Sequence, residues 1–224
     1  MRTLSPEEAK SYYDKFGRKQ DSQAFYENQA LEELTEHADL RDARSVFEFG
    51  CGTGRFALDL LRHHLPTTAR YVGTDISSTM VRLATERLAP FAPRASVALA
   101  SGKTALPLED ASVDRFIATY VFDLLPALDQ RELLAEVARV LRPEGLLCLC
   151  GITPGVTASS RLVMGVWQWL FARNASWVGG CRPVRAAEYL STDTWHTRYR
   201  TVVTAWGVAS EVVIAAPPSQ LTRA

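Results

Sequence analysis

The feature that most constrains this sequence is a glycine-rich turn directly after a short apolar segment. The run Ser45–Phe49 is typical of a buried strand, and Gly50, Gly52 and Gly54 follow it at once. Because glycine has no side chain, the backbone of this turn can approach a ligand closely and adopt unusual dihedral angles. Such a turn between a strand and a helix creates an anion- and nucleotide-binding crevice at the carboxyl end of a parallel sheet.

Strand-like and helix-like segments alternate after this turn, which predicts a parallel sheet with helices on both faces. The expected strands are 45–49, 70–75, 95–100, 113–119 and 146–151, and the expected helices are 55–65, 77–88 and 129–141. The last third departs from this alternation. It contains a tryptophan-rich, helix-like stretch at 161–177, a further helical candidate at 184–190, and strand-like runs at 199–206 and 208–215. Only Gly207 separates these last two runs, so an antiparallel hairpin is expected.

Asp75 ends the second expected strand, about twenty residues after the turn. At this offset a carboxylate can accept hydrogen bonds from both hydroxyl groups of a ribose, which indicates an adenosine-containing ligand. No GxxxxGKS or GxxxxGKT string occurs, so a P-loop nucleotide site is excluded. A GxGxxG motif starting at Gly50 also fails, because Arg55 occupies its sixth position.

The spacing Glu48-x-Gly50-x-Gly52-x-Gly54 resembles the first motif of the class I methyltransferases that use S-adenosylmethionine (SAM). Residues 74–80, 106–116 and 133–145 are similar to three later motifs of this family, in the same order. The resemblance spans residues 44–152, and the final hairpin also agrees with it. It implies a Rossmann-like α/β fold: a mostly parallel seven-stranded sheet, helices on both faces, a C-terminal antiparallel hairpin and an N-terminal helical lid.

The chain is expected to divide into a helical lid over residues 1–40 and a SAM-binding core over 41–224, with a tryptophan-rich insertion at 155–183. Ser5, Pro6 and Glu8 form a good helix start, and the helix-like pattern of the lid is broken near Gly17.

The resemblance also implies which residues contact SAM, whose product is S-adenosylhomocysteine. Asp75 would hold the ribose, and Ile76 would lie against the adenine. Glu48 is either a cofactor contact or a capping carboxylate. Many relatives carry an acidic residue where this chain has Gly102, so adenine recognition falls to backbone groups or to the Ser101 hydroxyl. The candidate cofactor residues are Tyr13, Glu48, Gly50, Gly52, Gly54, Asp75, Ile76, Met80, Ser101, Gly102 and Thr119.

Candidate catalytic and acceptor residues are assigned from their position. Tyr120 and Asp123 follow the fourth expected strand, beside the expected methyl group; Asp123 would orient or deprotonate an acceptor, or merely cap the following loop. The candidate substrate-binding residues are Tyr12, Trp167, Arg182 and His196. Trp167 and the tryptophans near it suggest a hydrophobic or aromatic acceptor, although such stripes also build cores. Arg182 and His196 would recognise an anionic group.

Composition restricts the partners and the compartment. The 25 basic and 25 acidic residues cancel, whereas proteins that grip long nucleic acids carry a basic surplus, so no nucleic-acid partner is expected. No segment is apolar for long enough to span a membrane, but Arg161 and Arg173 flank the apolar insertion and permit peripheral membrane contact. The four cysteines lack CxxC spacing, which predicts reduced thiols in a cytoplasmic protein and no metal site. The chain is expected to be a monomer or a homodimer.

The predicted function is the transfer of a methyl group from SAM to an oxygen or nitrogen of a small organic acceptor of hydrophobic or aromatic character. Two alternatives stay open: N-methylation of a phospholipid head group at a membrane surface, and SAM binding without catalysis. A nicotinamide-dependent oxidoreductase is less favoured, because the dinucleotide motif fails.

Overall fold

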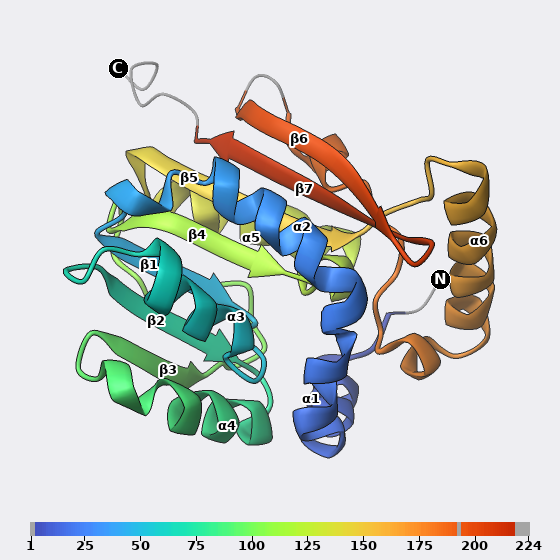
Figure 1. Cartoon of the computed structure of the whole chain (residues 1–224), viewed down its shortest axis with the longest axis horizontal. Helices are drawn as coiled ribbons and strands as arrows, with labels where there is room; N and C mark the ends of the chain where they lie inside the picture. Colours follow the sequence, from blue (N-terminus) through green and yellow to red (C-terminus); the bar gives the residue numbers. More distant parts are fainter. Residues whose placement is uncertain (1–2, 192–193, 218–224) are drawn as a thin grey trace.

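A seven-stranded sheet forms the centre of the molecule, in the strand order β3-β2-β1-β4-β5-β7-β6 (Figure 1). This computed structural model describes residues 3–191 and 194–217. The strands are β1 Ser45–Phe49, β2 Arg70–Asp75, β3 Ala95–Leu99, β4 Val113–Thr119, β5 Leu141–Ile152, β6 His196–Ala205 and β7 Val208–Ala216. Neighbouring strands are parallel except that β7 is antiparallel to both β5 and β6. The predicted Rossmann-like sheet with its C-terminal hairpin is confirmed.

Six α-helices surround the sheet in the described part of the chain. They are α1 Pro6–Phe16, α2 Ala24–His37, α3 Arg55–Asp59, α4 Ser78–Leu88, α5 Ala127–Val140 and α6 Ala158–Arg173. Polar residues begin three of them, because a side-chain oxygen can accept from a free N–H of the first turn. Ser5 caps α1, Ser77 caps α4 and Thr157 caps α6. None of the helices in residues 3–191 and 194–217 combines the length and the apolar character that crossing a membrane requires.

The side chains of the sheet alternate between two hydrophobic layers. On β5, Cys148 and Cys150 pack in the layer that contains α2 and α3, whereas Leu147 and Leu149 pack in the layer that contains α5. This alternation follows from the two-residue period of a strand. Both cysteines therefore share one face of the sheet, where they are buried, free thiols.

Two segments differ from the sequence-based boundaries. β5 begins at Leu141, because Leu141 already pairs with Val113 ahead of an irregularity in the β4–β5 register. The expected helix at 184–190 is only the short 3-10 helix η7, Ala186–Tyr189. Its preceding residue Val184 instead donates its N–H to the Ile152 carbonyl at the end of β5, which holds that part of the chain extended.

Helix α3 continues into a π-helical turn, η3, over Leu60–His64. His63 and His64 therefore end this helix, as predicted, and their rings lie 4.0 and 3.3 Å from the Asp59 carboxylate.

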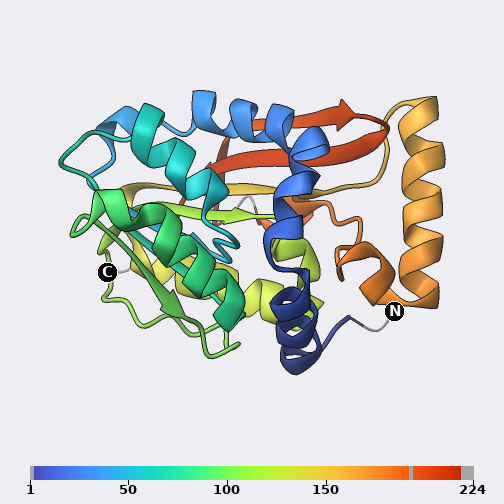
Figure 2. The same cartoon turned by 60° about the horizontal axis from the view of Figure 1, so that its bottom comes forward.

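Helix α1 and the 3-10 helix η1, Gly17–Gln23, lie beyond the carboxyl ends of β1, β2 and β4, where the strand arrows point toward them (Figures 1 and 2). Two carboxylates hold them there. Asp14 accepts hydrogen bonds from the Ser77 hydroxyl at 2.6 Å and the Thr79 N–H at 3.1 Å, at the start of α4. Asp21 forms an ion pair with Arg87, 2.6 Å away.

Helix α2 belongs to a different layer from α1, although both fall within the predicted lid of residues 1–40. Its buried residues Leu31 and Leu34 pack in the core layer beside β5 and β7. The part of the N-terminal segment that covers the strand ends therefore stops near Gln23.

Arg115 on β4 ties the C-terminal end of α2 to the sheet. Its guanidinium, 6% exposed, donates to the carbonyls of Ala38 and Asp39, both at 2.6 Å. These carbonyls follow the last turn of α2, where the helix itself offers no N–H partner.

We expect Arg115→Met to lower the free energy of unfolding by about 2–3 kcal/mol, because it removes the charged donor from both carbonyls and leaves that of the buried residue Ala38 without this partner. Denaturation by urea, followed by circular dichroism, measures the change. Arg131→Met, the same replacement at an exposed position of α5, is the control and should change stability by less than about 0.5 kcal/mol. Equal stability of the two variants would contradict the assigned role.

Candidate functional site

A cavity of about 260 Å³ lies where β1, β2 and β4 end, between these strands and the N-terminal segment. The sheet side is lined by Gly50, Thr74, Asp75, Ile76, Thr119 and Tyr120. The N-terminal side is lined by Leu4, Ser5, Pro6, Tyr13 and Gln20. A doubly wound sheet binds ligands at this edge, where neighbouring connections diverge.

The glycine turn needs glycine at each of its three positions. Gly50, Gly52 and Gly54 have φ angles of 78°, 53° and 73°, which residues with a side chain rarely adopt. A Cβ atom on Gly50 would lie 2.7 Å from Val121, and one on Gly52 would lie 2.6 Å from the Gln20 amide. The turn is further fixed by the Gly50 and Cys51 N–H groups, which both donate to the Thr74 carbonyl.

Asp75 connects this turn to the end of β2. Its carboxylate accepts from the Gly52 N–H and from the Ser77 N–H, each at 2.9 Å. The side chain is 9% exposed and lines the cavity. Burial raises the pKa of Asp75 to about 6, although both N–H groups act in the opposite direction. A carboxylate held in this way can accept further hydrogen bonds from hydroxyl groups in the cavity.

Glu48 lies behind the turn, in a small cavity of about 40 Å³ that it shares with Gly50, Thr119 and Gln20. It is 1% exposed and accepts a hydrogen bond from the Tyr71 hydroxyl at 2.5 Å. Burial raises the pKa of Glu48 to about 7, and the nearby Asp75 carboxylate adds to this shift. The structure thus places a second acidic group beside the turn.

Gln20 is a site residue that the sequence did not indicate. It lines both cavities, and its Oε1 atom is buried without a hydrogen-bond partner among the described residues. A single glutamine in a polar N-terminal segment belongs to no sequence pattern that would identify it as a site residue. Only the packing of η1 over Gly52 brings it to the glycine turn.

The other end of the cavity is narrow and apolar. Gly102 has a φ angle of 79°, and a Cβ atom there would lie 3.0 Å from Ile76 and 3.1 Å from Pro6. Five predicted cofactor residues do not line this cavity: Glu48, Gly52, Gly54, Met80 and Ser101. Glu48 lies behind the glycine turn that contains Gly52 and Gly54. Ser101 is exposed, and Met80 is fully buried on α4.

Tyr120 occupies the first position after β4 in a left-handed conformation, with φ at 54°. Such a conformation is uncommon for a residue with a large side chain and often marks a functional site. The ring lines the cavity, and the hydroxyl lies 2.9 Å from the Ser210 hydroxyl.

Asp123 lies deeper than Tyr120 and does not line the cavity. One carboxylate oxygen accepts from the Ile152 N–H at 3.1 Å, and the other has no hydrogen-bond partner among the described residues. Burial raises the pKa of Asp123 to about 7. The first of these contacts ties the loop after β4 to the end of β5, which is the structural role considered for this residue.

The two predicted lid tyrosines point in different directions. Tyr13 lines the cavity and donates its hydroxyl to the Gly179 carbonyl at 3.0 Å, so it joins α1 to the segment after α6. Tyr12 instead stacks on Phe16 and borders an open hollow between α1 and Asn174.

The remaining candidate acceptor residues lie outside the cavity. The Trp167 indole donates to the Cys181 carbonyl at 2.9 Å, and the Arg182 guanidinium donates to the Leu125 carbonyl at 2.6 Å, so both brace the backbone. His196 must be corrected. It starts β6 and pairs with Ala216, whereas the end of β5 that borders the site pairs with Ser210 at the other end of β7.

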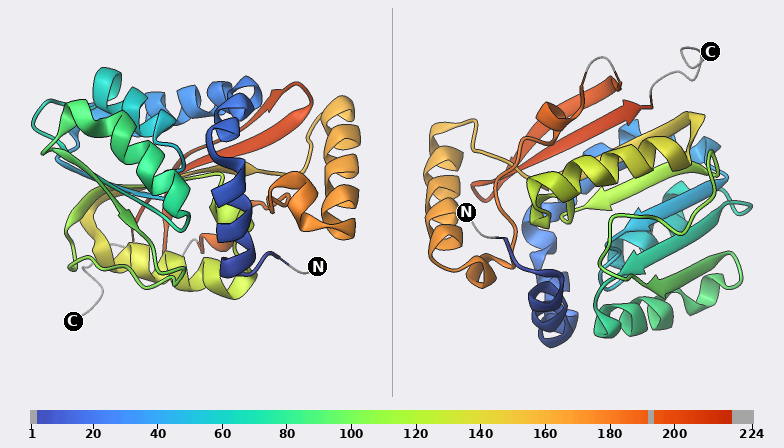
Figure 3. Two further views of the ribbon diagram at one scale, coloured as in Figure 1. Left: turned by 90° about the horizontal axis from the view of Figure 1, so that it is seen from below. Right: turned by 180° about the vertical axis from the view of Figure 1, so that it is seen from behind.

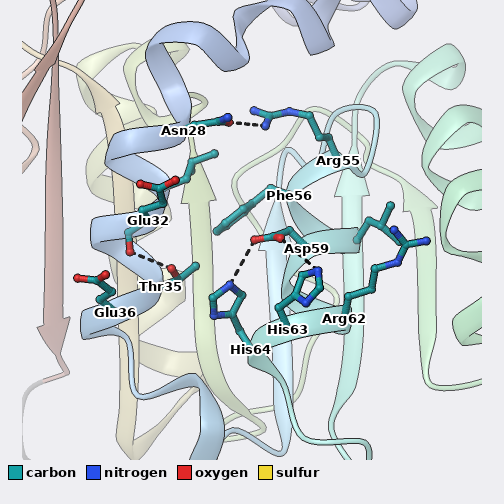
Figure 4. Close-up of a pocket in the computed structure, with 12 residues that line it drawn as sticks. Asn28, Glu32, Thr35, Glu36, Arg55, Phe56, Asp59, Arg62, His63 and His64 are labelled. Atoms are coloured by element: carbon teal, nitrogen blue, oxygen red, sulfur yellow. Dashed lines mark hydrogen bonds and ion pairs between the residues drawn. The ribbon is translucent and has the colours of Figure 1, made fainter.

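A separate groove of about 430 Å³ lies between α2 and the α3–η3 segment (Figure 4). Its charged side chains interact with one another: Arg55 donates to Asn28 at 2.7 Å, and His64 lies 3.3 Å from Asp59. The groove lies against the helices that cover one face of the sheet, away from Asp75 and Tyr120, and we do not assign the function to it.

Comparison with known proteins agrees with this geometry. A family model described as a methyltransferase domain matches residues 46–145. The ubiquinone/menaquinone biosynthesis C-methyltransferase of Geobacter sulfurreducens is 31% identical over 137 residues, which are 60% of this chain and 51% of that protein. The chain thus spans about half the length of this curated relative.

Solved structures share the whole fold at low sequence identity. The [4+2]-cyclase SpnF superposes with a TM-score of 0.74 at 14% identity, over 97% of this chain and 98% of that one. The N-methyltransferase NodS of Bradyrhizobium japonicum, solved with S-adenosyl-L-homocysteine, gives a TM-score of 0.65 at 15% identity, over 86% and 87%. At these identities the likeness concerns the fold alone.

The buried Asp123 carboxyl makes stability depend on pH. Below about pH 4 the Asp123 carboxyl is protonated in both the folded and the unfolded chain, so its burial lowers the stability of the fold only slightly there. As the pH rises from about 4 to 7, the unfolded chain ionises first, and the folded chain loses up to about 4 kcal/mol of stability.

We expect Asp123→Asn to remove this loss while keeping an oxygen that can accept from Ile152. The variant should therefore melt several degrees above the wild type at pH 8 and close to it at pH 4, as measured by scanning calorimetry. Asp42→Asn, at an exposed position, is the matched control and should change neither temperature. A lower melting temperature of Asp123→Asn at pH 8 would show that the ionised carboxylate stabilises the fold.

Proposed function

We propose that the chain is a class I SAM-dependent methyltransferase that transfers a methyl group from SAM to a small, largely apolar organic acceptor. The match of residues 46–145 to the methyltransferase family model and the likeness to the named methyltransferases support this proposal. The observation that carries this proposal is the hydrogen bond from the Gly52 N–H to the Asp75 carboxylate. This bond joins the glycine turn to the end of β2 at the edge of the cavity.

The residues around the cavity fit SAM in charge and in shape. When bound, SAM supplies a methyl group on a positively charged sulfur, which is already a good leaving group. Asp75 and Glu48 provide negative charge near the glycine turn, and Asp75 can accept from ribose hydroxyls. The buried, unpaired Oε1 atom of Gln20 offers an acceptor for the ammonium group of the methionine part. Ile76, Gly102 and Pro6 line the far end of the cavity, where Ile76 offers an apolar surface for an adenine ring.

The N-terminal segment would exclude water from the reaction. Asp14 and Asp21 fasten it to the core, and Tyr13 fastens it to Gly179. Excluding water and aligning the acceptor with the methyl–sulfur bond are the main contributions that such an enzyme makes.

The acceptor side of the cavity favours an apolar molecule. Its lining after β4 includes the apolar residues Val121, Leu124, Leu125 and Pro126, together with Tyr120 and Asp129, and Leu4 lines it from the N-terminal segment. The named relative from Geobacter is a C-methyltransferase of quinone biosynthesis, which is consistent with a ring-containing acceptor. The acceptor atom proposed for this chain is therefore carbon, oxygen or nitrogen.

We expect Asp75→Ala to weaken SAM binding about a hundredfold, because it removes a charged acceptor for two hydroxyl groups. Isothermal titration calorimetry with SAM measures the dissociation constant. Asp59→Ala, an aspartate outside this cavity whose side chain is 51% exposed, is the control and should bind SAM as the wild type does. Unchanged binding by Asp75→Ala would overturn the assignment of the site. Formation of S-adenosylhomocysteine with a panel of phenolic, amine and carbon-acid acceptors then tests transfer itself.

The affinity for SAM should also depend on pH. Burial raises the pKa of Asp75 to about 6 and of Glu48 to about 7, so both carboxyls take up protons as the pH falls below these values. A cationic ligand binds the ionised form better, so affinity should fall roughly tenfold or more between pH 8 and pH 5.5. Titrations in two buffers of different ionisation enthalpy should show protons released on binding near pH 6. A constant affinity over this range would contradict the proposed contact with these carboxylates.

A further inference from the structure

Helix α6 turns an apolar face toward solvent. Leu162, Val166 and Trp169 lie on one side of the helix at helical spacing and are 72%, 52% and 54% exposed. The opposite side is buried through Met164 and Phe171. A surface helix normally carries polar residues on its outer side, so α6 reverses the expected pattern. Both views of Figure 3 show α6 at the outer edge of the molecule.

The apolar surface continues beyond α6 to the tip of the β6–β7 hairpin. A Cβ atom on Gly207 at this tip would lie 2.6 Å from Val163 of α6, so the two elements touch. The adjacent Trp206 is 80% exposed, and its ring lies 6.5 Å from that of Phe25, which is 60% exposed. We call Leu162, Val166, Trp169, Trp206 and Phe25 the apolar face. Large apolar side chains that are exposed on neighbouring elements in this way mark sites of interaction.

The charged residues of α6 and of the segments that flank it in sequence are all arginines. No aspartate or glutamate occurs between Glu144 and Glu188, whereas this stretch holds four arginines, in a chain whose formal net charge is zero. Arg161 lies in the first turns of α6 and Arg173 at its end, where its guanidinium packs 4.9 Å from the centre of the Trp169 ring. Tryptophan and arginine beside an apolar helix face are the residues that bind the head-group region of a bilayer.

We propose that the apolar face docks on a lipid bilayer that contains anionic lipids. Leu162, Val166 and Trp169 would enter the boundary between head groups and acyl chains, and Arg161 and Arg173 would contact lipid phosphates. A second copy of this chain fits the same face less well. Two α6 helices packed against each other would bring only arginines together, because α6 carries no acidic residue to pair with them.

The docking surface is connected to the lid of the cavity. The segment after α6 contains Gly179, whose carbonyl accepts from Tyr13 of α1, and Cys181, whose carbonyl accepts from Trp167 of α6. A bilayer bound to α6 would therefore lie next to the segment after α6, which holds Tyr13 of the N-terminal lid. The docking itself does not depend on methyl transfer and is measured without SAM or acceptor.

Flotation of the full chain with lipid vesicles tests the proposal. The wild type should bind vesicles of phosphatidylcholine and phosphatidylglycerol, and bind vesicles of phosphatidylcholine alone more weakly. Leu162→Glu/Trp169→Glu should reduce the partition coefficient at least about tenfold, because two apolar side chains no longer leave water. Arg161→Gln/Arg173→Gln should reduce only the preference for phosphatidylglycerol.

Leu128→Glu is the matched control, because Leu128 is a large apolar side chain, 71% exposed, on α5 and outside the apolar face. It should bind vesicles as the wild type does. Circular dichroism of each variant establishes that it folds, and quenching of wild-type tryptophan fluorescence by brominated lipid reports insertion without any substitution. Absence of wild-type binding to both vesicle types would overturn the proposal, as would equal loss of binding in Leu128→Glu. A wild-type dimer that Trp169→Glu dissociates, with no binding to vesicles, would assign the face to a second copy.

Discussion

The hydrogen bond from the Gly52 N–H to the Asp75 carboxylate is the interaction on which the site depends. It joins the turn after β1 to the end of β2, so two neighbouring strands present their ends as one surface. The bond requires a backbone that only glycine adopts easily at Gly52, and a carboxylate at the last position of β2. Burial of Asp75 makes it a stronger acceptor for ligand hydroxyls, because water does not compete for its oxygens.

Polar contacts hold the N-terminal segment to the core, whereas apolar side chains of this segment line the cavity. Asp14 and Asp21 reach α4 from the N-terminal segment and hold this segment against the core. Leu4, Pro6 and Tyr13 then face the cavity, where they displace water without adding competing charge. In the proposed complex, the carboxylates near the turn would meet the positive charge of SAM, while the acceptor side is mainly apolar.

The features that could be predicted from the sequence are formed by residues that are close together along the chain. β1, the glycine turn, β2 and Asp75 are encoded within one continuous stretch, and their spacing determines their geometry. Gln20, Pro6 and Val121 reach the same cavity from separate segments, and no local pattern marks them. His196 failed as a candidate for the same reason. Its place depends on which end of β7 pairs with which end of β5, and this register is a property of the whole sheet.

The acceptor side decides the chemistry, because the same fold also carries a [4+2]-cyclase. In this chain that side combines the strained backbone of Tyr120 with apolar residues after β4. The buried Asp123 carboxyl accepts from the Ile152 N–H and does not line the cavity, whereas Asp129, in the first turn of α5, does. In the proposed enzyme, an acceptor there would meet mainly apolar side chains, and Asp129 is a carboxylate that could accept its proton. The proposed contribution of this side is therefore to displace water from the acceptor and to hold it in line with the methyl group.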